Sequence, residues 1–226
     1  MPKIAEAMVP RTTTDIVYDS LFNEIITLEL LPGAKISEAE VAGRLGVSRQ
    51  PVRDAFNRLG NAGLLTIRPQ RATEVRRFSI ERIENTRFVR RAVELEVISE
   101  ACRVWDAERA DKLEANLSEQ RRAIGSGSTA RFHELDYNFH RLICELSGHP
   151  LAFETIQECK RPVDRLCLLS LGHYEEVAAI LEEHERIANA LSRGSLTEAR
   201  DMVHRHMSRL DNTIAEIHEA HSEYFE

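Results

Sequence analysis

From Ser79 onward the chain shows one kind of periodicity: apolar residues lie three and four positions apart, and no stretch alternates as a strand would. Helices with this pattern bury their apolar sides against one another, so we expect an antiparallel bundle over residues 78–222. The fourth helix contains Pro162, where we expect a kink. The six predicted helices are those around Leu95–Trp105, 107–124, 132–146, 156–170, 180–191 and 199–217.

The first part of the chain has a different organisation. A first helix, predicted to open near residue 14, is followed by two short helices joined through Gly46. Ser37 and Glu40 form a capping-box pattern that opens the earlier of these two helices. Ser48 is a good N-cap for the later one, which is rich in arginine. Two helices connected in this way are typical of a helix-turn-helix.

A hairpin is predicted directly after the third helix. Residues 64–67 and 72–75 have the composition of short strands, and Arg68-Pro-Gln-Arg71 can form the turn between them. Three helices followed by a hairpin wing predict a winged helix-turn-helix over residues 10–77. We therefore expect a mainly α protein, with this small domain followed by the six-helix bundle.

Charge is unevenly distributed between the two parts. Residues 44–77 contain eight arginines and two acids, Asp54 and Glu74, which leaves a net charge of +6. Since the whole chain carries −7, the remainder carries −13. A basic block in an otherwise acidic protein indicates that this block alone contacts nucleic acid.

The chain has no apolar run approaching the roughly 18 residues of a membrane span. The opening MPKIAEAMVPR also lacks the apolar centre of a secretion signal. We therefore expect a cytoplasmic protein with no membrane partner.

The first turns of the third helix carry the side chains expected to meet DNA bases: Ser48, Arg49, Gln50 and Arg53. Arginine can pair with guanine through two hydrogen bonds, and glutamine can pair with adenine in the same way. Arg71, in the hairpin turn, is a candidate for contact with the minor groove or a phosphate. The alternative for these residues is an ordinary solvated surface.

Four residues with metal-binding side chains lie on the core-facing sides of three helices of the predicted bundle: Asp136, His140, His184 and His206. Such groups are costly to bury without partners. Together they suit a divalent ion, zinc foremost, with nickel, manganese or iron(II) as further possibilities. The alternatives are that each histidine is a hydrogen-bonded core residue, or that His133 replaces one of the four as a ligand.

Motifs in both halves resemble known bacterial regulators. Leu31-Pro-Gly, Ser37-Glu-Ala-Glu-Val-Ala, Leu45-Gly-Val-Ser-Arg-Gln-Pro-Val-Arg-Asp-Ala and Gly63-Leu-Leu resemble the N-terminal domain of the GntR family. Arg90 with Glu94, Leu135-Asp-Tyr-Asn-Phe-His140, Glu183-His-Glu-Arg-Ile-Ala and Ala199-Arg-Asp-Met-Val-His-Arg-His206 resemble the FadR-type branch with its C-terminal FCD domain. With six predicted helices, the C-terminal domain resembles that of the VanR-like subgroup. Ala72 departs from the family, which usually has glycine at the wing tip.

The resemblance implies a homodimer that reads a palindromic operator in double-stranded DNA. One recognition helix covers only a few base pairs, which agrees with the need for two copies. The resemblance also implies that Asp136, His140, His184 and His206 are metal ligands, and that Arg90 binds an anionic group of an effector. A metal beside a guanidinium favours a carboxylate effector. The alternative for Arg90 is a simple ion pair with Glu94, four residues on.

We therefore predict a transcription repressor whose operator affinity is controlled by a small organic acid at the metal site. We do not expect an enzyme, because no further general base, nucleophile or phosphate loop accompanies the candidate metal centre. The alternatives are a hydrolytic metal centre, a regulator that senses the metal itself, and a metal that only braces the fold.

Overall fold

The computed structural model describes residues 11–160, 166 and 174–226, and the chain divides into two compact units. Unit 1 is the described part of Met1–Arg77 together with Glu223–Glu226, and unit 2 is Phe78–Ser222. The largest apolar cluster of each unit draws on residues of that unit alone. The mainly α fold class predicted from the sequence is confirmed.

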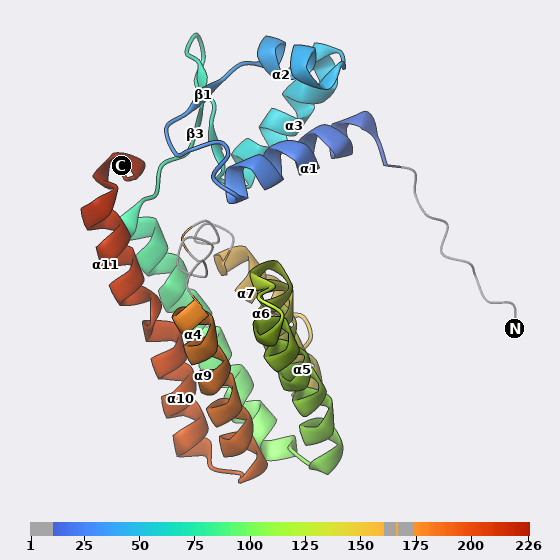
Figure 1. Ribbon diagram of the computed structural model, residues 1–226, viewed down its shortest axis with the longest axis vertical. Coiled ribbons are helices and arrows are strands. Elements are labelled where there is room, and N and C mark those ends of the chain that lie inside the picture. Colours follow the sequence, from blue (N-terminus) through green and yellow to red (C-terminus); the bar gives the residue numbers. More distant parts are fainter. Residues whose placement is uncertain (1–10, 161–165, 167–173) are drawn as a thin grey trace, which may run out of the picture. The chain divides into compact units, whose positions relative to one another are not determined.

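The described residues of unit 1 contain three α-helices, which Figure 1 shows in blue to cyan. The first has a complete capping box, in which the Thr12 hydroxyl accepts from the Asp15 amide and the Asp15 carboxylate accepts from the Thr12 amide. The second begins after Ser37, whose hydroxyl accepts from the Glu40 amide at 3.1 Å. The helices are α1 (Thr13–Ile26), α2 (Glu38–Leu45) and α3 (Arg49–Asn61).

The turn between α2 and α3 depends on glycine. Gly46 follows α2 with a φ of +66°, in the left-handed region that other residues adopt only with strain. Ser48 occupies the N-cap position of α3, as predicted, but its side chain makes no capping hydrogen bond within the described part of the chain. The Ser48 hydroxyl therefore does not hold the start of this helix in place.

A small antiparallel sheet completes unit 1, with the strand order β1-β3-β2. β2 (Leu65–Thr66) and β3 (Thr73–Val75) form the predicted hairpin, with Leu65 opposite Val75. β1 (Lys35–Ile36) pairs with the other edge of β3 and was not predicted from the sequence. Two residues are too few for an alternating pattern to appear in a sequence.

The core of unit 1 fixes the orientation of α3. Val52 and Leu59 of α3 are fully buried against Val17 and Leu21 of α1. Burial of each such side chain contributes about 1.5–3 kcal/mol. The opposite side of α3 therefore remains exposed, and this side carries the arginines of its first turns.

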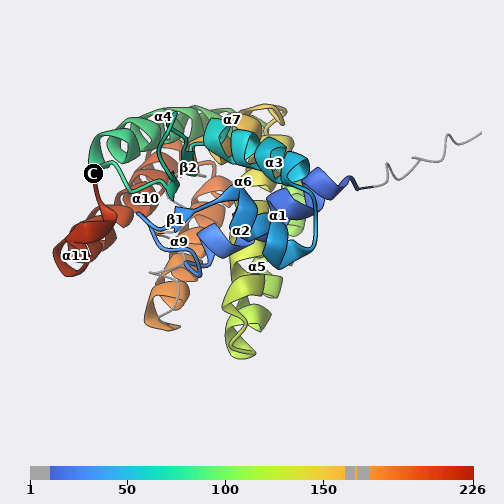
Figure 2. The ribbon, with the colours of Figure 1, turned by 90° about the horizontal axis from the view of Figure 1, so that it is seen from above.

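From Ile80 onward, the described regular secondary structure of unit 2 is helical. α5 packs against α6 and α9, and α4 packs against α7 and α10 (Figures 1 and 2). No described helix combines the length and the apolar character needed to cross a lipid bilayer. The helices are α4 (Ile80–Val104), α5 (Ala107–Gly125), α6 (Thr129–Leu146), α7 (Ala152–Lys160), α9 (Tyr174–Ser192), α10 (Leu196–Ser208) and α11 (Leu210–Ala220).

The C-terminal end of unit 2 differs from the sequence prediction in one respect. The stretch 199–217, predicted as one helix, forms the two helices α10 and α11, separated at Arg209. The apolar spacing runs through this break, so periodicity does not reveal it. The predicted kink at Pro162 lies outside the described residues.

A polar cluster interrupts the apolar core of unit 2. The surrounding core includes Ile98, Phe139 and Ile187, each almost completely buried. The buried polar residues of unit 2 are Glu94, Ser99, Asn116, Gln120, Asp136, His140, Ser147, Lys160 and His184. Buried ionisable groups of this kind need partners, and their partners define the candidate site.

Candidate metal centre and nucleic-acid interface

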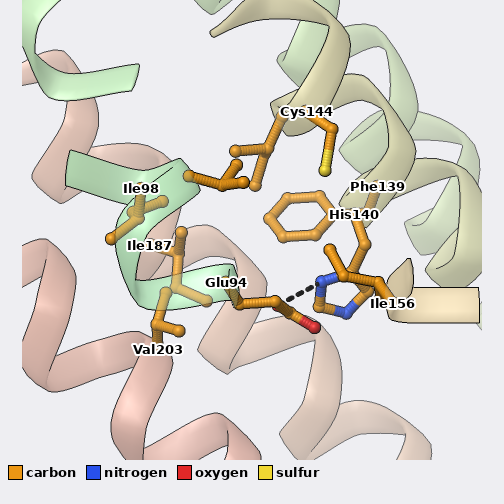
Figure 3. A pocket seen from close by; sticks show the side chains of 10 residues that line it. Glu94, Ile98, Phe139, His140, Cys144, Ile156, Ile187 and Val203 are labelled. Atoms are coloured by element: carbon orange, nitrogen blue, oxygen red, sulfur yellow. Dashed lines mark ion pairs between the residues drawn. The ribbon is translucent and has the colours of Figure 1, made fainter. Parts of the chain in front are cut away.

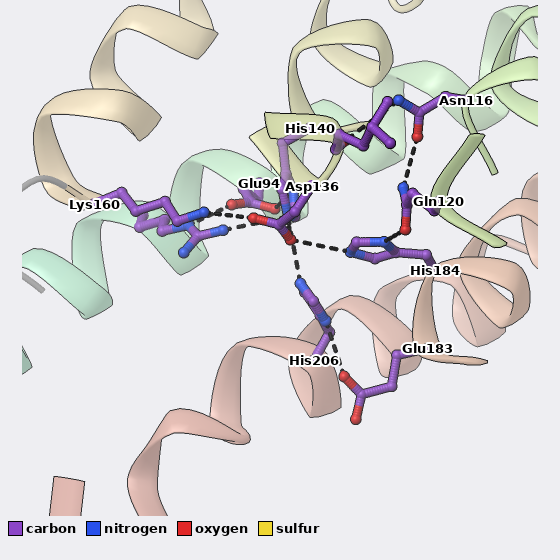
Figure 4. Close-up of polar contacts among 11 residues, drawn as sticks. Glu94, Asn116, Gln120, Asp136, His140, Lys160, Glu183, His184 and His206 are labelled. Carbon is purple, nitrogen blue, oxygen red and sulfur yellow. Dashed lines mark hydrogen bonds and ion pairs between the residues drawn. The ribbon is translucent and has the colours of Figure 1, made fainter. Parts of the chain in front are cut away.

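The four predicted ligands meet in the core of unit 2 (Figure 4). Asp136 and His140 come from α6, His184 from α9 and His206 from α10, and one ligand atom of each lies within 4.8 Å of all the others. Asp136 Oδ1 is 3.5 Å from His184 Nε2, and the Nε2 atoms of His140 and His206 are 3.3 Å apart. A carboxylate oxygen and three imidazole nitrogens grouped in this way suit a divalent transition metal.

Each of the three histidines is oriented through its other ring nitrogen. The Nδ1 atom of each ring lies 2.9 Å from a carboxylate or amide oxygen. Because these oxygens can only accept, Nδ1 carries the proton and Nε2 keeps its lone pair for the cluster. Metal-binding histidines are commonly held by contacts of this kind. The pairs are His140 with Glu94, His184 with Gln120 and His206 with Glu183.

The tautomer of His184 is fixed by a chain of amides that ends on the backbone. Asn116 Nδ2 donates to the carbonyl oxygen of Leu135 at 3.2 Å, and Gln120 Nε2 donates to Asn116 Oδ1 at 2.6 Å. A backbone carbonyl can only accept, so each amide in the chain has one possible orientation. Gln120 Oε1 therefore faces His184 as an acceptor. Asn116 and Gln120 were missed by the sequence analysis, although both interrupt the buried face of α5 four residues apart.

One atom of the cluster lacks a partner that a metal would supply. His184 Nε2 is buried and has no hydrogen-bond partner among the described residues. An unsatisfied buried polar atom costs about 1–3 kcal/mol. The ring is also stacked on Phe139, with the ring centroids 4.0 Å apart, so it has little freedom to turn elsewhere. The residues present therefore fit a bound metal ion.

Burial and neighbouring charges set the protonation states of the cluster. Burial lowers the pKa of His140 and holds the pKa of His184 well below its usual range. Burial alone would raise the pKa of Asp136, but the charge of Lys160 and its hydrogen bond hold the pKa of Asp136 well below the usual value. At neutral pH the cluster therefore offers two neutral imidazoles and an ionised carboxylate, the forms that bind metal ions.

Arg90 reaches the cluster from α4. Its Nε donates to Glu94 Oε1 at 2.7 Å, and its Nη2 lies 3.4 Å from His140 Nε2. Arg90 thus makes the ion pair expected from its spacing to Glu94 and also lies beside a candidate ligand atom. Only 12% of its side chain is exposed, so its charge acts in a partly desolvated place.

Lys160 is a further cation at the site, and the sequence analysis missed it. Its Nζ lies 2.5 Å from Asp136 Oδ2 and 3.8 Å from the centre of the Tyr137 ring. Lys160 is the last residue of α7, and its approach to Asp136 depends on how α7 packs beside α6. No local sequence pattern carries that information.

His133, the predicted rival ligand, is not one of the four grouped residues. Its ring lies edge-on to Tyr137, with the centroids 5.2 Å apart. Burial lowers the pKa of His133 to about 4, with Lys160 adding to the effect. His133 is therefore a neutral histidine beside the cluster and not a member of it.

A small pocket borders the cluster on the side of Glu94 and His140 (Figure 3). The rest of its lining is apolar and includes Ile98, Ile143 and Ile187. Its free space corresponds to roughly one water molecule. This pocket by itself holds nothing larger than a small group such as a water molecule.

The candidate DNA-contacting side chains lie together on the exposed side of α3: Ser48, Arg49, Gln50 and Arg53. Two of them are paired within unit 1. Arg53 donates from Nε and Nη2 to the two carboxylate oxygens of Glu38, at 3.0 and 2.9 Å. Gln50 Nε2 donates to Asp54 Oδ1 at 3.0 Å. These contacts hold the side chains in place, and both would open if the side chains contacted bases.

Arg71 is exposed in the hairpin turn, next to a shallow depression that Lys35 and Arg68 also line. The residue of this turn with a left-handed backbone is Gln70, with a φ of +59°. Ala72 is not among the described residues with positive φ, so the loss of the family's usual glycine does not strain the turn.

A winged helix-turn-helix with an arginine-rich exposed helix, joined to a helical unit with a buried polar cluster, defines a DNA-binding regulator class. Residues 13–75 match the family described as "Bacterial regulatory proteins, gntR family", and residues 86–209 match the FCD domain. The chain belongs to the GntR family of transcriptional regulators and carries an FCD domain. It is not an enzyme, because the family and its relatives are regulators.

Curated relatives span nearly the whole chain. The HTH-type transcriptional repressor RspR of Escherichia coli (strain K12) is 34% identical over 92% of this chain and 92% of its own. An uncharacterized HTH-type regulator in an unstable DNA locus of Streptomyces ambofaciens is 32% identical over 94% of this chain and 89% of its own. Among solved structures, E. coli McbR/YncC covers 93% of this chain and 99% of its own, with a TM-score of 0.70 at 20% identity, a likeness of fold.

Proposed function

We propose that this regulator is a repressor whose affinity for its operator is set by a small organic acid bound at a metal ion in unit 2. The observation that carries the proposal is the cluster of Asp136 with three histidines, each turned toward the others by a partner on Nδ1. Zinc is the first candidate, and nickel, manganese or iron(II) could use the same donors. The name of the E. coli relative, a repressor, supports the direction of control.

Asp136, His140, His184 and His206 would hold the ion. When bound, the metal supplies open coordination positions that a carboxylate oxygen can fill. Arg90 would bind the acid through its guanidinium, since it lies 3.4 Å from His140 Nε2 and already pairs with a carboxylate, Glu94.

Control of DNA binding requires that the acid binds two conformations unequally. Arg90 belongs to α4, which begins at Ile80, directly after the winged unit in the chain. A ligand that draws Arg90 toward the metal would therefore act on the helix to which the winged unit is attached. This connection gives the ligand a physical route to DNA affinity.

Ser48, Arg49, Gln50 and Arg53 would read bases in the major groove, and Arg71 would contact a phosphate or the minor groove. The operator would be a palindrome bound by a homodimer in the cytoplasm. Exposed apolar side chains on α4 support dimerisation, because a second copy of the chain could cover them. Phe88 is 64% exposed and Val89 is 42% exposed.

The test is operator binding by the metal-loaded protein. A duplex selected from random DNA by the protein itself would be titrated in fluorescence anisotropy, with and without a panel of small organic acids. We expect a subset of acids to lower the affinity at least about fivefold, a typical allosteric coupling. His184→Ala should lose this response, while His204→Ala, an exposed histidine of α10, should keep it. Two results would contradict the proposal: a response to acids that persists in His184→Ala, or a wild-type protein whose operator affinity changes with none of the acids.

A further inference from the structure

Two cations contact the four candidate ligands. Lys160 Nζ lies 2.5 Å from Asp136 Oδ2, while the other oxygen of Asp136 faces His184. Arg90 Nη2 lies 3.4 Å from His140 Nε2. Figure 4 shows Lys160 extending from α7 toward Asp136. The cluster is therefore bordered by positive charge before any metal is considered.

Lys160 is buried to an extent that is rare for lysine. Only 5% of the residue is exposed, and its ammonium lies over the Tyr137 ring. A lysine side chain usually carries its ammonium group into water. Here it points inward, and its carboxylate partner among the described residues is Asp136. The ammonium group of Lys160 is thus held by Asp136, a candidate metal ligand, and not by solvent.

The charges of the described residues around the cluster balance without a metal. Among the described residues in or against it, three carboxylates face three cations, paired as Asp136 with Lys160, Glu94 with Arg90 and Glu183 with Arg209. A divalent ion adds two positive charges to this neutral and largely buried set. Uncompensated charge in such a place is strongly unfavourable.

We propose that Lys160 neutralises Asp136 in the metal-free protein, opposes the incoming metal, and thereby makes the effector a small dianion of the dicarboxylate class. The inference rests on the proposed function and adds the charge of the ligand. Two carboxylates offset the two charges of the ion, and Arg90 and Lys160 lie near enough to the ligand atoms to pair with them. Metal and effector therefore bind cooperatively, because each is held weakly without the other.

The experiment measures zinc affinity with free zinc held constant by a chelator buffer, because dicarboxylates themselves bind zinc. Wild type and Lys160→Met are each compared without acid, with malonate, and with malonamate, its singly charged half-amide. In wild type we expect malonate to raise zinc affinity about tenfold or more, and malonamate to raise it less than about threefold. Without acid, Lys160→Met should bind zinc about tenfold more tightly than wild type, because a repelling charge is gone.

Lys112→Met is the matched control, since Lys112 pairs with Glu108 on the exposed side of α5 and should behave as wild type. In Lys160→Met the advantage of malonate over malonamate should largely disappear. If that variant does not fold, Lys160→Gln repeats the comparison, and the wild-type comparison of the two acids stands without any variant.

Two results would overturn the inference. Equal effects of malonate and malonamate on wild type would show that the second charge is not recognised. Weaker zinc binding by the Lys160 variants without acid would show that Lys160 positions Asp136 for the metal and does not oppose it. If the protein binds zinc but responds only to singly charged acids, the claim that the effector is a dianion is overturned and the proposed function stands. If neither wild type nor any variant binds zinc, the proposed function is overturned as well.

Discussion

Gln120 Oε1 accepts a hydrogen bond from His184 Nδ1 at 2.9 Å, and this contact decides which nitrogen of His184 faces the cluster. The orientation of Gln120 is itself fixed through Asn116 to the backbone carbonyl of Leu135. The chain of contacts therefore leaves the lone pair of His184 Nε2 facing Asp136, His140 and His206. Histidines that bind metal ions are commonly held in this way through their other ring nitrogen.

Removal of the acceptor should weaken metal binding without abolishing the fold. We expect Gln120→Leu to lower zinc affinity about 10- to 100-fold in a chelator competition, because His184 loses the contact that orients it. Gln120→Glu keeps an acceptor for Nδ1 and should retain affinity near that of wild type. Equal losses in both variants would show that Gln120 serves packing and not the orientation of His184.

Stability of the metal-free protein should depend on pH below neutrality. Burial lowers the pKa of His133 from 6.5 to about 4, so the unfolded chain takes up a proton that the folded chain refuses. The contribution of His133 to the free energy of unfolding should therefore be fully present above pH 6.5 and should decrease as the pH falls toward 4. We expect a loss on the order of 1–3 kcal/mol from this residue in urea denaturation. His133→Asn should make that part of the profile less steep, while the buried His140 and His184 still contribute to it, and an unchanged slope would contradict the assignment.

The pair between Arg53 and Glu38 should restrain DNA binding. Glu38→Gln removes a carboxylate that holds both guanidinium donors and repels phosphates, so we expect operator affinity to rise several-fold. Arg53→Ala should lower operator affinity and relax the preference at one base position. Glu40→Gln, which changes an exposed acid of α2, serves as the control. Weaker binding by Glu38→Gln would mean that Glu38 itself orients Arg53 for the bases.

Two glycines of unit 1 should respond oppositely to alanine. Gly46→Ala forces a side chain into a φ of +66° and should cost about 1 kcal/mol of stability. Gly43→Ala lies within α2, where an added Cβ meets no described atom within 4 Å, and should stabilise by roughly 0.5–1 kcal/mol. Thermal denaturation of the two variants measures both effects, and equal shifts would contradict the role given to the turn.

Much of this architecture is visible in the sequence because it depends on local patterns. Spacing places Asp136 and His140 on one side of a helix, and the structure brings both to His184 and His206. The features that could not be predicted from the sequence depend on packing between elements that are distant in the chain. Lys160 meets Asp136 only because α7 lies beside α6, and β1 exists only because β3 offers it an edge. The break between α10 and α11 at Arg209 was not predicted for another reason, because the apolar spacing continues across it.

The most direct test of the central claim is the metal content of the purified protein, measured by elemental analysis after preparation without chelators. We expect about one divalent ion per chain in wild type and in His204→Ala, and essentially none in His184→Ala. A wild-type protein that is metal-free and cannot be loaded with zinc, nickel, manganese or iron(II) would contradict the assignment of Asp136, His140, His184 and His206 as a metal centre.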